Sequence, residues 1–330
     1  MKSKLKIKRK LILIILICSL TIANYSAFSQ LYPLSSINFT EKYSVNKAYA
    51  GLSGNKILNI RVRQQWGNLK NSPVNYKLFY ILPLPQIKSG AGIEFDVNDQ
   101  SIFQQISGGV SYNYIKNTDF GNFSFGPSIS FSNINISKDR ILTPDGKYEG
   151  GIYNPYDNFI EVAGGKNEKF IGSNIFLVYL FNNFEFGIEF DNIIKLEAIS
   201  KNKYLKILKV NFQYQYLFNE NITFRFNDVF YSDLVLWQND MNLVSIINGN
   251  IIAGINFRGI SLITFESIGL ITGADLTNSI KLIYSYDFGM NSLNRIHSGS
   301  HELSLYYNFG KSGFVRRTPP VIFNPRLISD

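Results

Sequence analysis

The chain has 330 residues and a formal net charge of +9, with 15% aromatic and 17% charged residues. Six of its basic residues precede residue 11, so the rest of the chain carries a formal charge of only +3, which removes the argument from charge for a nucleic-acid partner. The single cysteine is Cys18. A chain without its first 29 residues would therefore hold no disulfide and no cysteine metal site.

The first 29 residues have the three parts of a secretory signal peptide. A basic stretch, Lys2–Lys10, precedes an apolar run, Leu11–Ile22, and small residues at Ala27 and Ser29 suit cleavage before Gln30. A single membrane anchor is the alternative. The apolar run is shorter than the roughly 20 residues of a spanning helix, so we expect a signal peptide that is removed.

Beyond this region, apolar and polar residues alternate in many short segments. In residues 184–191, for example, four apolar side chains alternate with Glu, Gly, Glu and Asp. Residues two apart in a strand share a face, so each segment has one apolar and one polar side. Alternation and turn signals predict about fourteen strands, near residues 56–66, 73–81, 91–98, 102–115, 121–137, 170–180, 184–191, 204–217, 221–231, 234–247, 249–257, 260–269, 279–287 and 301–309.

An even number of such strands is typical of a bacterial outer-membrane barrel. Barrel closure satisfies the backbone donors, as a bilayer requires, and 20 tyrosines and 27 phenylalanines suit interfacial girdles. Charged or amide residues interrupt every later apolar run, which excludes transmembrane helices. We therefore predict an all-β, antiparallel transmembrane β-barrel, in which Phe184, Phe186, Ile188 and Phe190 face lipid. A secreted soluble sandwich or solenoid is the alternative.

The connections between strands sort partly by length, as they do between the two rims of outer-membrane barrels. If the first strand runs outward, long connections at 138–169, 192–203 and 288–300 are outer loops, whereas Asn248-Gly249 is a tight inner hairpin. Inner links near 82–90 and 270–278 are longer than this pattern predicts. The chain then divides into a signal peptide (1–29), a periplasmic N-terminal segment (30–55), the barrel (56–309) and a short periplasmic tail (310–330).

Charged residues on the polar strand faces are expected to point into the lumen. They can form ion pairs across the barrel or line an aqueous path, and the sequence does not choose between the two. These candidate lumen-facing residues are Arg61, Arg63, Glu94, Glu185, Glu189 and Arg225.

Two segments without strand patterning are candidates for partner contact. Residues 138–169 contain a Pro-Asp-Gly turn signal and tyrosines among glycines, which suit protein recognition; a lid or plug in the lumen is the alternative. The candidate contacts of this loop are Asp145, Tyr148, Tyr153 and Tyr156. In the tail, Arg316 and Arg317 are candidate periplasmic contacts, although its proline content also suits a disordered tail.

The sequence offers little that indicates catalysis. Its two histidines, His297 and His301, belong to no metal-binding motif. Ser304 is three positions from His301 and should lie on the opposite strand face, which disfavours a Ser-His hydrolase of the lipase or protease type. We expect no catalytic, cofactor-binding or metal-binding residues.

Four motifs, in the same order, resemble a known family. The chain contains Asn46-Lys47-Ala48-Tyr49-Ala50-Gly51, Arg63-Gln64-Gln65-Trp66, Leu142-Thr143-Pro144-Asp145-Gly146 and Gly299-Ser300-His301-Glu302-Leu303-Ser304-Leu305. Together these are similar to the PorP/SprF family of type IX secretion membrane proteins of Bacteroidetes. Lys47 stands where that family typically has proline.

This resemblance implies a non-enzymatic outer-membrane component of the type IX secretion system. Such a protein would help the export or surface attachment of a large secreted partner, often an adhesin of gliding motility, and would link to the periplasmic machinery. A passive channel or hydrophobe transporter is the second hypothesis, motivated by polar strand faces with both charge signs. An outer-membrane lipase or protease is the third.

Overall fold

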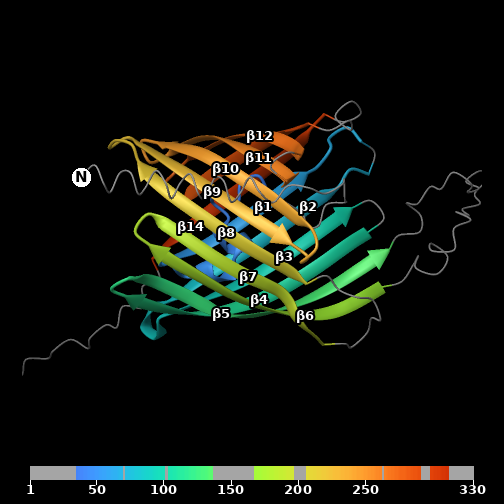
Figure 1. The fold of residues 1–330 in the computed structure, drawn as a ribbon, viewed down its shortest axis with the longest axis horizontal. Coiled ribbons are helices and arrows are strands. Elements are labelled where there is room, and N and C mark those ends of the chain that lie inside the picture. Colours follow the sequence, from blue (N-terminus) through green and yellow to red (C-terminus); the bar gives the residue numbers. More distant parts are fainter. Residues whose placement is uncertain are drawn as a thin grey trace, which may run out of the picture.

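The computed structural model describes residues 35–69, 71–100, 103–136, 167–196, 206–261, 264–290 and 298–311. In this part of the chain, fourteen antiparallel strands form one closed barrel, in which β1 closes on β14 (Figure 1). The strands are β1 (Asn55–Gln64), β2 (Val74–Leu84), β3 (Ser89–Gln100), β4 (Phe103–Thr118), β5 (Gly121–Ile136), β6 (Asn167–Phe181), β7 (Phe184–Leu196), β8 (Ile207–Leu217), β9 (Ile222–Ser232), β10 (Trp237–Ile247), β11 (Ile251–Ser261), β12 (Thr264–Asp275), β13 (Ile280–Gly289) and β14 (Ser300–Lys311).

The predicted fold class and strand order are confirmed, but two predicted connections are too long. Pairing continues to Leu84 opposite Ser89 and to Asp275 opposite Lys281, so the links near 82–90 and 270–278 shrink to 85–88 and 276–279. All six connections at this end of the barrel then have two to four residues. We call this end the short-turn rim and the opposite end the long-loop rim.

The hairpin between β10 and β11 forms where the sequence predicted it. Asn248 has φ 50° and Gly249 has φ 72°, and positive φ at both central residues is what the tightest hairpin turns require. In the two-residue connection between β6 and β7, one residue, Asn182, also has positive φ, at 51°. Asparagine and glycine tolerate this conformation better than other residues, so these turns are encoded locally.

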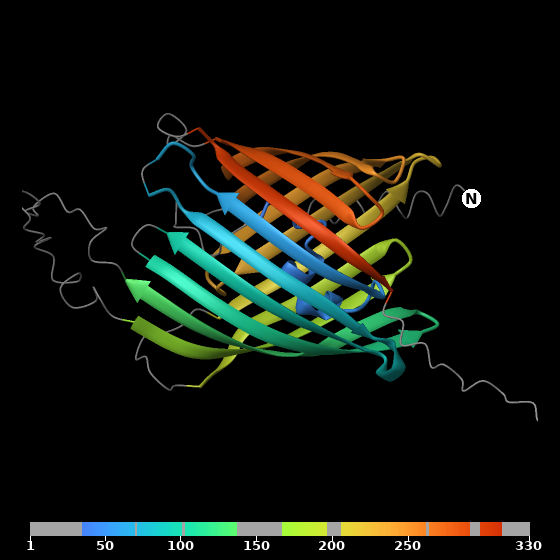
Figure 2. The ribbon, with the colours of Figure 1, turned by 180° about the vertical axis from the view of Figure 1, so that it is seen from behind.

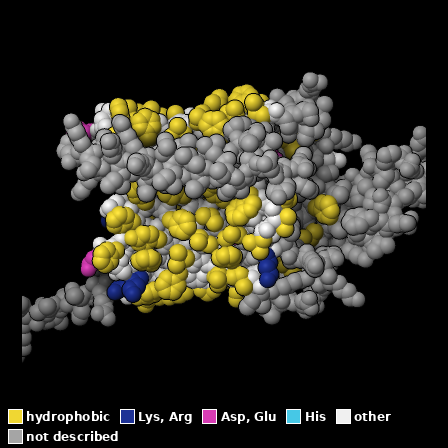
Figure 3. Space-filling model, viewed as in Figure 1, with side chains coloured by type: hydrophobic (Ala, Val, Ile, Leu, Met, Phe, Trp, Pro, Cys, Tyr) yellow, Lys and Arg dark blue, Asp and Glu magenta, His cyan; other side chains and the backbone are white. Residues whose placement is uncertain are grey.

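The outer wall of the barrel is apolar. Phe184, Phe186 and Phe190 are each about 40% exposed, whereas Glu189 between them is completely buried, so the predicted faces of this strand are confirmed. Figure 3 shows hydrophobic side chains over the visible wall and charged ones near its two ends. This is the surface that a membrane barrel presents to lipid.

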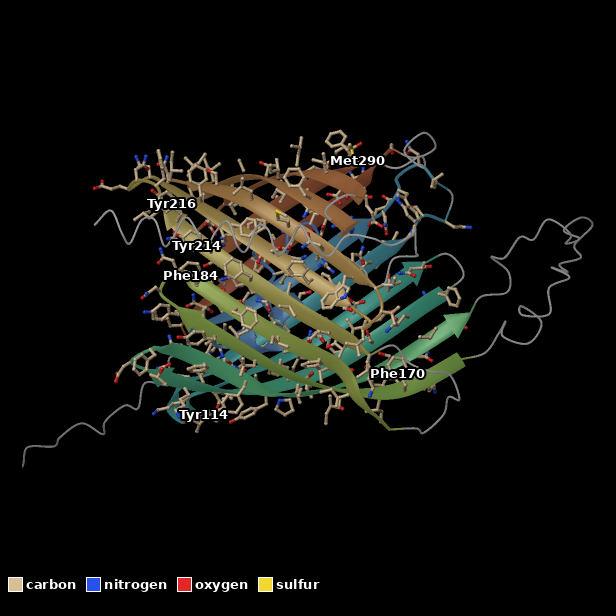
Figure 4. All side chains as sticks on the ribbon, viewed as in Figure 1. Tyr114, Phe170, Phe184, Tyr214, Tyr216 and Met290 are labelled. Carbon is tan, nitrogen blue, oxygen red and sulfur yellow. The ribbon has the colours of Figure 1, made fainter. Side chains whose placement is uncertain are left out.

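Aromatic side chains gather on the outer face near the short-turn rim. Phe184 stacks on Tyr214 with ring centroids 4.5 Å apart, and Tyr114 packs edge-on against Phe125 at 5.9 Å. In Figure 4, Phe184, Tyr214 and Tyr216 all project at this end of the barrel, whereas Met290 lies at the other. Aromatic girdles of this kind mark the membrane interface.

The chain before β1 fills the inside of the barrel. Residues 35–54, which we call the plug, contain α2 (Lys42–Val45) and η1 (Lys47–Tyr49), and Figure 2 shows both short helices enclosed by the strands. From residue 35 to residue 50, all but Thr40 and Lys42 are buried. The sequence predicts a periplasmic location outside the barrel for residues 30–55, and the structure differs for residues 35–54. The location differs because this polar segment bonds to the polar inner wall.

In the described part of the chain, the other helix is the short 3-10 turn η2 (Pro85–Ile87) between β2 and β3. Across the described ranges, no helix is long and apolar enough to cross a membrane.

Because the outer wall faces lipid, an arginine introduced on it should destabilise the barrel more near the middle of the membrane than near its surface. Ile129, which is 59% exposed, lies in the middle of β5, so Ile129→Arg should lower the free energy of unfolding in lipid vesicles by about 2–4 kcal/mol. Tyr216→Arg, at the end of β8, is the control and should cost about 0–1 kcal/mol. Urea titration of both variants measures the difference, and equal costs would contradict the assignment of this face.

Candidate functional site

The plug begins in the half of the lumen nearer the long-loop rim. The Ser36 backbone N–H donates to Glu302 at 2.7 Å, and the Ser36 hydroxyl donates to Asp287 at 2.7 Å. Arg63 forms ion pairs with both carboxylates, at 2.9 and 2.6 Å, and Arg258 reaches Asp287 at 3.1 Å. These wall residues lie near the long-loop ends of β1, β11, β13 and β14, so this cluster fixes the first turn of the plug.

A second buried ion pair holds the middle of the plug. Glu41 accepts from Arg61 at 2.7 Å and from the Ser304 hydroxyl at 2.8 Å. Arg61 also donates to Asn75 at 2.8 Å. Glu41, Arg61 and Ser304 are all at most 2% exposed, and buried charges of this kind need both a counter-ion and satisfied hydrogen bonds. The wall supplies the cation and the plug supplies the anion.

On β3 and β7 the signs of charge are reversed. The Lys47 ammonium contacts Glu94 at 2.6 Å, and the Lys47 backbone N–H donates to Glu189 at 2.7 Å. Lys42 forms an ion pair with Glu185 at 2.7 Å. The plug therefore bonds to carboxylates of β3 and β7 through its cations, and its backbone N–H at Lys47 donates to the buried carboxylate of Glu189.

Apolar contacts also hold the plug against the inner wall. Four small clusters each join one part of the plug to inward-facing residues of the wall, and fully burying one such side chain contributes about 1.5–3 kcal/mol. The wall residues of these clusters are Val244, Ile252, Ile271 and Ile283 (with Ile37 and Phe39), Val229 and Tyr231 (with Val45), Phe79 and Ile81 (with Tyr43 and Ala50), and Phe176 and Val178 (with Ala48 and Tyr49). Because these wall residues would meet water without the plug, it is a structural part of the barrel.

The six candidate lumen charges all lie on the inner wall, and five contact the plug. Arg61, Arg63, Glu94, Glu185 and Glu189 bond to it directly. Arg225 instead donates to Gln215 of the neighbouring strand at 3.2 Å. Of the two uses left open by the sequence, ion pairing describes these residues better than an aqueous path.

The remaining candidate residues divide into two groups. Asp145, Tyr148, Tyr153, Tyr156, Arg316, Arg317 and His297 lie outside the residues that the structure describes. His301 and Ser304 are described and lie on opposite faces: His301 contacts the Tyr284 hydroxyl at 2.7 Å, whereas Ser304 is buried against Glu41. Among the described residues, no cluster of three metal-ligating side chains occurs.

Sequence reasoning missed the plug, although a signal for it exists. Leu270 is 53% exposed and its neighbour Ile271 is 3% exposed, and Leu243 and Val244 differ in the same way, at 46% and 0%. Adjacent apolar residues in one strand mean that both faces meet apolar surroundings. In a barrel, such pairs indicate a lumen that is filled rather than open.

A cavity lies at the short-turn rim. It has a volume of about 940 Å³, and its floor is the plug, at Phe39, Tyr43 and Tyr49. The turns 248–250 and 276–279 form part of its edge. We call it the vestibule. Because the plug closes its inner end, the vestibule does not continue into a path across the barrel.

The comparison with family models decides which family this is. The model for the type IX secretion system membrane protein PorP/SprF matches residues 27–307. The chain belongs to the PorP/SprF family. The expected resemblance is thereby confirmed, and together with the closed barrel it places this PorP/SprF protein in the outer membrane.

Solved structures with a similar barrel have very different sequences. The chain is 9% identical to the outer membrane protein Omp33 of Acinetobacter baumannii, with a TM-score of 0.47, covering 77% of this chain and 98% of that one. It is 10% identical to the KdgM porin, with a TM-score of 0.40, covering 77% and 99%. No curated protein matches. Residues 46–51, part of the family resemblance, belong to the plug.

The buried pairs predict unequal costs for two lysine substitutions. Lys47→Met removes the ion-pair partner of Glu94 inside the barrel, and should lower the free energy of unfolding by about 3–5 kcal/mol. Lys281→Met is the matched control: Lys281 and Asp275 are 3.3 Å apart but about one-third exposed, so the cost should be about 0–1 kcal/mol. Denaturant titration in detergent compares the two, and equal losses would show that the plug contributes little.

Proposed function

We propose that this PorP/SprF protein helps the export or surface attachment of a large secreted partner, such as an adhesin of gliding motility in a Bacteroidetes bacterium. The long-loop rim would hold the partner, and the short-turn rim would face the periplasmic machinery. Family membership supports a component of type IX secretion, and the filled lumen supports action at the rims rather than transport through the barrel. Family membership alone does not say where on the barrel the protein acts. The filled lumen is the observation that supports action at the two rims.

The proposed role is not catalytic. His301 and Ser304 point to opposite faces of β14, and Ser304 is engaged by Glu41. Within the described residues, the buried carboxylates bond to arginine, lysine, serine or asparagine, which is how structural buried charges are stabilised. These contacts give no support to the lipase or protease hypothesis.

Deletion of the gene tests the proposed role directly. In a strain without this protein, the amount of the large secreted protein encoded nearest to it should decrease on the cell surface. Its amount in the periplasm or the medium should increase. Surface protease accessibility and fractionation measure both amounts. Complementation with the intact gene is the control, and unchanged surface delivery would contradict the proposal.

The channel hypothesis makes the opposite prediction about ion conductance. Because the plug fills the lumen, the purified protein should give no ion-conducting events in planar bilayers. Deletion of residues 35–53 should open a polar lumen of the kind that conducts in porins and should produce discrete conductance steps. Steady conductance of the intact barrel would favour the channel hypothesis over the one proposed here.

A further inference from the structure

The vestibule has the surface of a protein-binding pocket. Partly exposed aliphatic side chains, including Leu52, Ile57 and Leu180, lie in its interior, and the polar turns 248–250 and 276–279 form its edge. An apolar centre with a polar rim is the usual anatomy of a protein interface. Since the plug blocks the way onward, the cavity suits a segment that docks and stays there rather than a solute in transit.

The charges of the vestibule favour an anionic ligand. Its lining contains three cations and two carboxylates. Lys42 is paired with Glu185 at 2.7 Å and Lys281 with Asp275 at 3.3 Å. In the part of the chain that the structure describes, the fifth group, Arg225, makes no ion pair, and its Nε has no hydrogen-bond acceptor. One positive charge is therefore left over beside an apolar pocket.

We propose that the vestibule binds an extended segment of another periplasmic protein, in which a carboxylate lies next to a large apolar side chain. The carboxylate pairs with Arg225, because a guanidinium binds a carboxylate through two parallel hydrogen bonds. The apolar side chain packs against Leu52, Ile57 and Leu180, which line the cavity and are partly exposed. This inference rests on the proposed function in one respect, that the short-turn rim faces the periplasmic machinery.

Photo-crosslinking in cells tests this docking site. Benzoylphenylalanine at Leu276, which is 59% exposed at the vestibule edge, is the probe, and the same probe at Val235, 76% exposed in the connection between β9 and β10 at the opposite rim, is the control. We expect an adduct with a periplasmic protein from Leu276, and we expect that the probe at Val235 does not capture the same protein. Mass spectrometry of the adduct should map it to a segment with Asp or Glu beside an apolar residue.

Substitution of Arg225 then tests the charge. Arg225→Gln removes the charge at similar size and should reduce the Leu276 adduct at least about tenfold, as expected when one partner of a buried charge pair is lost. Arg225→Lys keeps the charge and should reduce it less. Heat-dependent gel mobility and the amount in the outer membrane show that each variant is folded. Should Arg225→Gln fail to fold, the mapped acidic residue of the partner is changed to Asn or Gln instead, with the same expected loss.

Several results would overturn the proposal. These are no adduct from Leu276, an adduct to residues 312–330 of the same chain, a crosslinked segment without a carboxylate, or an adduct that is undiminished when the Arg225 charge or its partner is removed. The outcome is separable from the proposed function. If gene deletion leaves surface delivery unchanged while the adduct depends on Arg225, only the proposed function fails; if delivery is lost but no adduct forms, only the docking site fails.

Discussion

The need to neutralise charges inside the barrel determines much of this structure. Arg61, Arg63 and Glu189 lie on the inner wall with at most 5% exposure, where an unpaired charge would cost several kcal/mol. A wide barrel usually solves this with water. Here a segment of the chain itself supplies the partners, with Glu41 opposite an arginine and Lys47 opposite carboxylates. The closed lumen follows directly from how these charges are satisfied.

The barrel was predictable because its signals are local. Alternation within a strand sets which side chains face outward, and pairs such as Asn248-Gly249 set the turns, so residues 184–191 and the β10–β11 hairpin could be placed without knowledge of their neighbours. The plug depends on contacts between residues far apart in sequence. Glu41 meets Ser304 and Ser36 meets Asp287, and no spacing along the chain encodes such a meeting.

In the candidate site, too, locally encoded features could be predicted and long-range contacts could not. The faces of Arg61 and Glu189 followed from strand periodicity, but their partners did not, since residues 30–55 carry no strand pattern and were therefore assigned to the periplasm. The vestibule could not be predicted from the sequence either, because its lining residues come from the plug and from many different strands. Only the apolar pairs, such as Leu270-Ile271, gave a local hint that something apolar fills the lumen.

The plug also has a consequence for how the barrel closes. β1 and β14 are the ends of the barrel in sequence, and joining them closes a loop of more than two hundred residues, at an entropic cost that grows with loop length. Arg61 stands opposite Ser304, and Arg63 opposite Glu302, across this seam. Glu41 bonds to both members of the first pair, and Ser36 to both members of the second. Plug insertion and pairing of β1 with β14 therefore favour each other. A barrel in which β1 and β14 are not paired would also bind the plug less tightly.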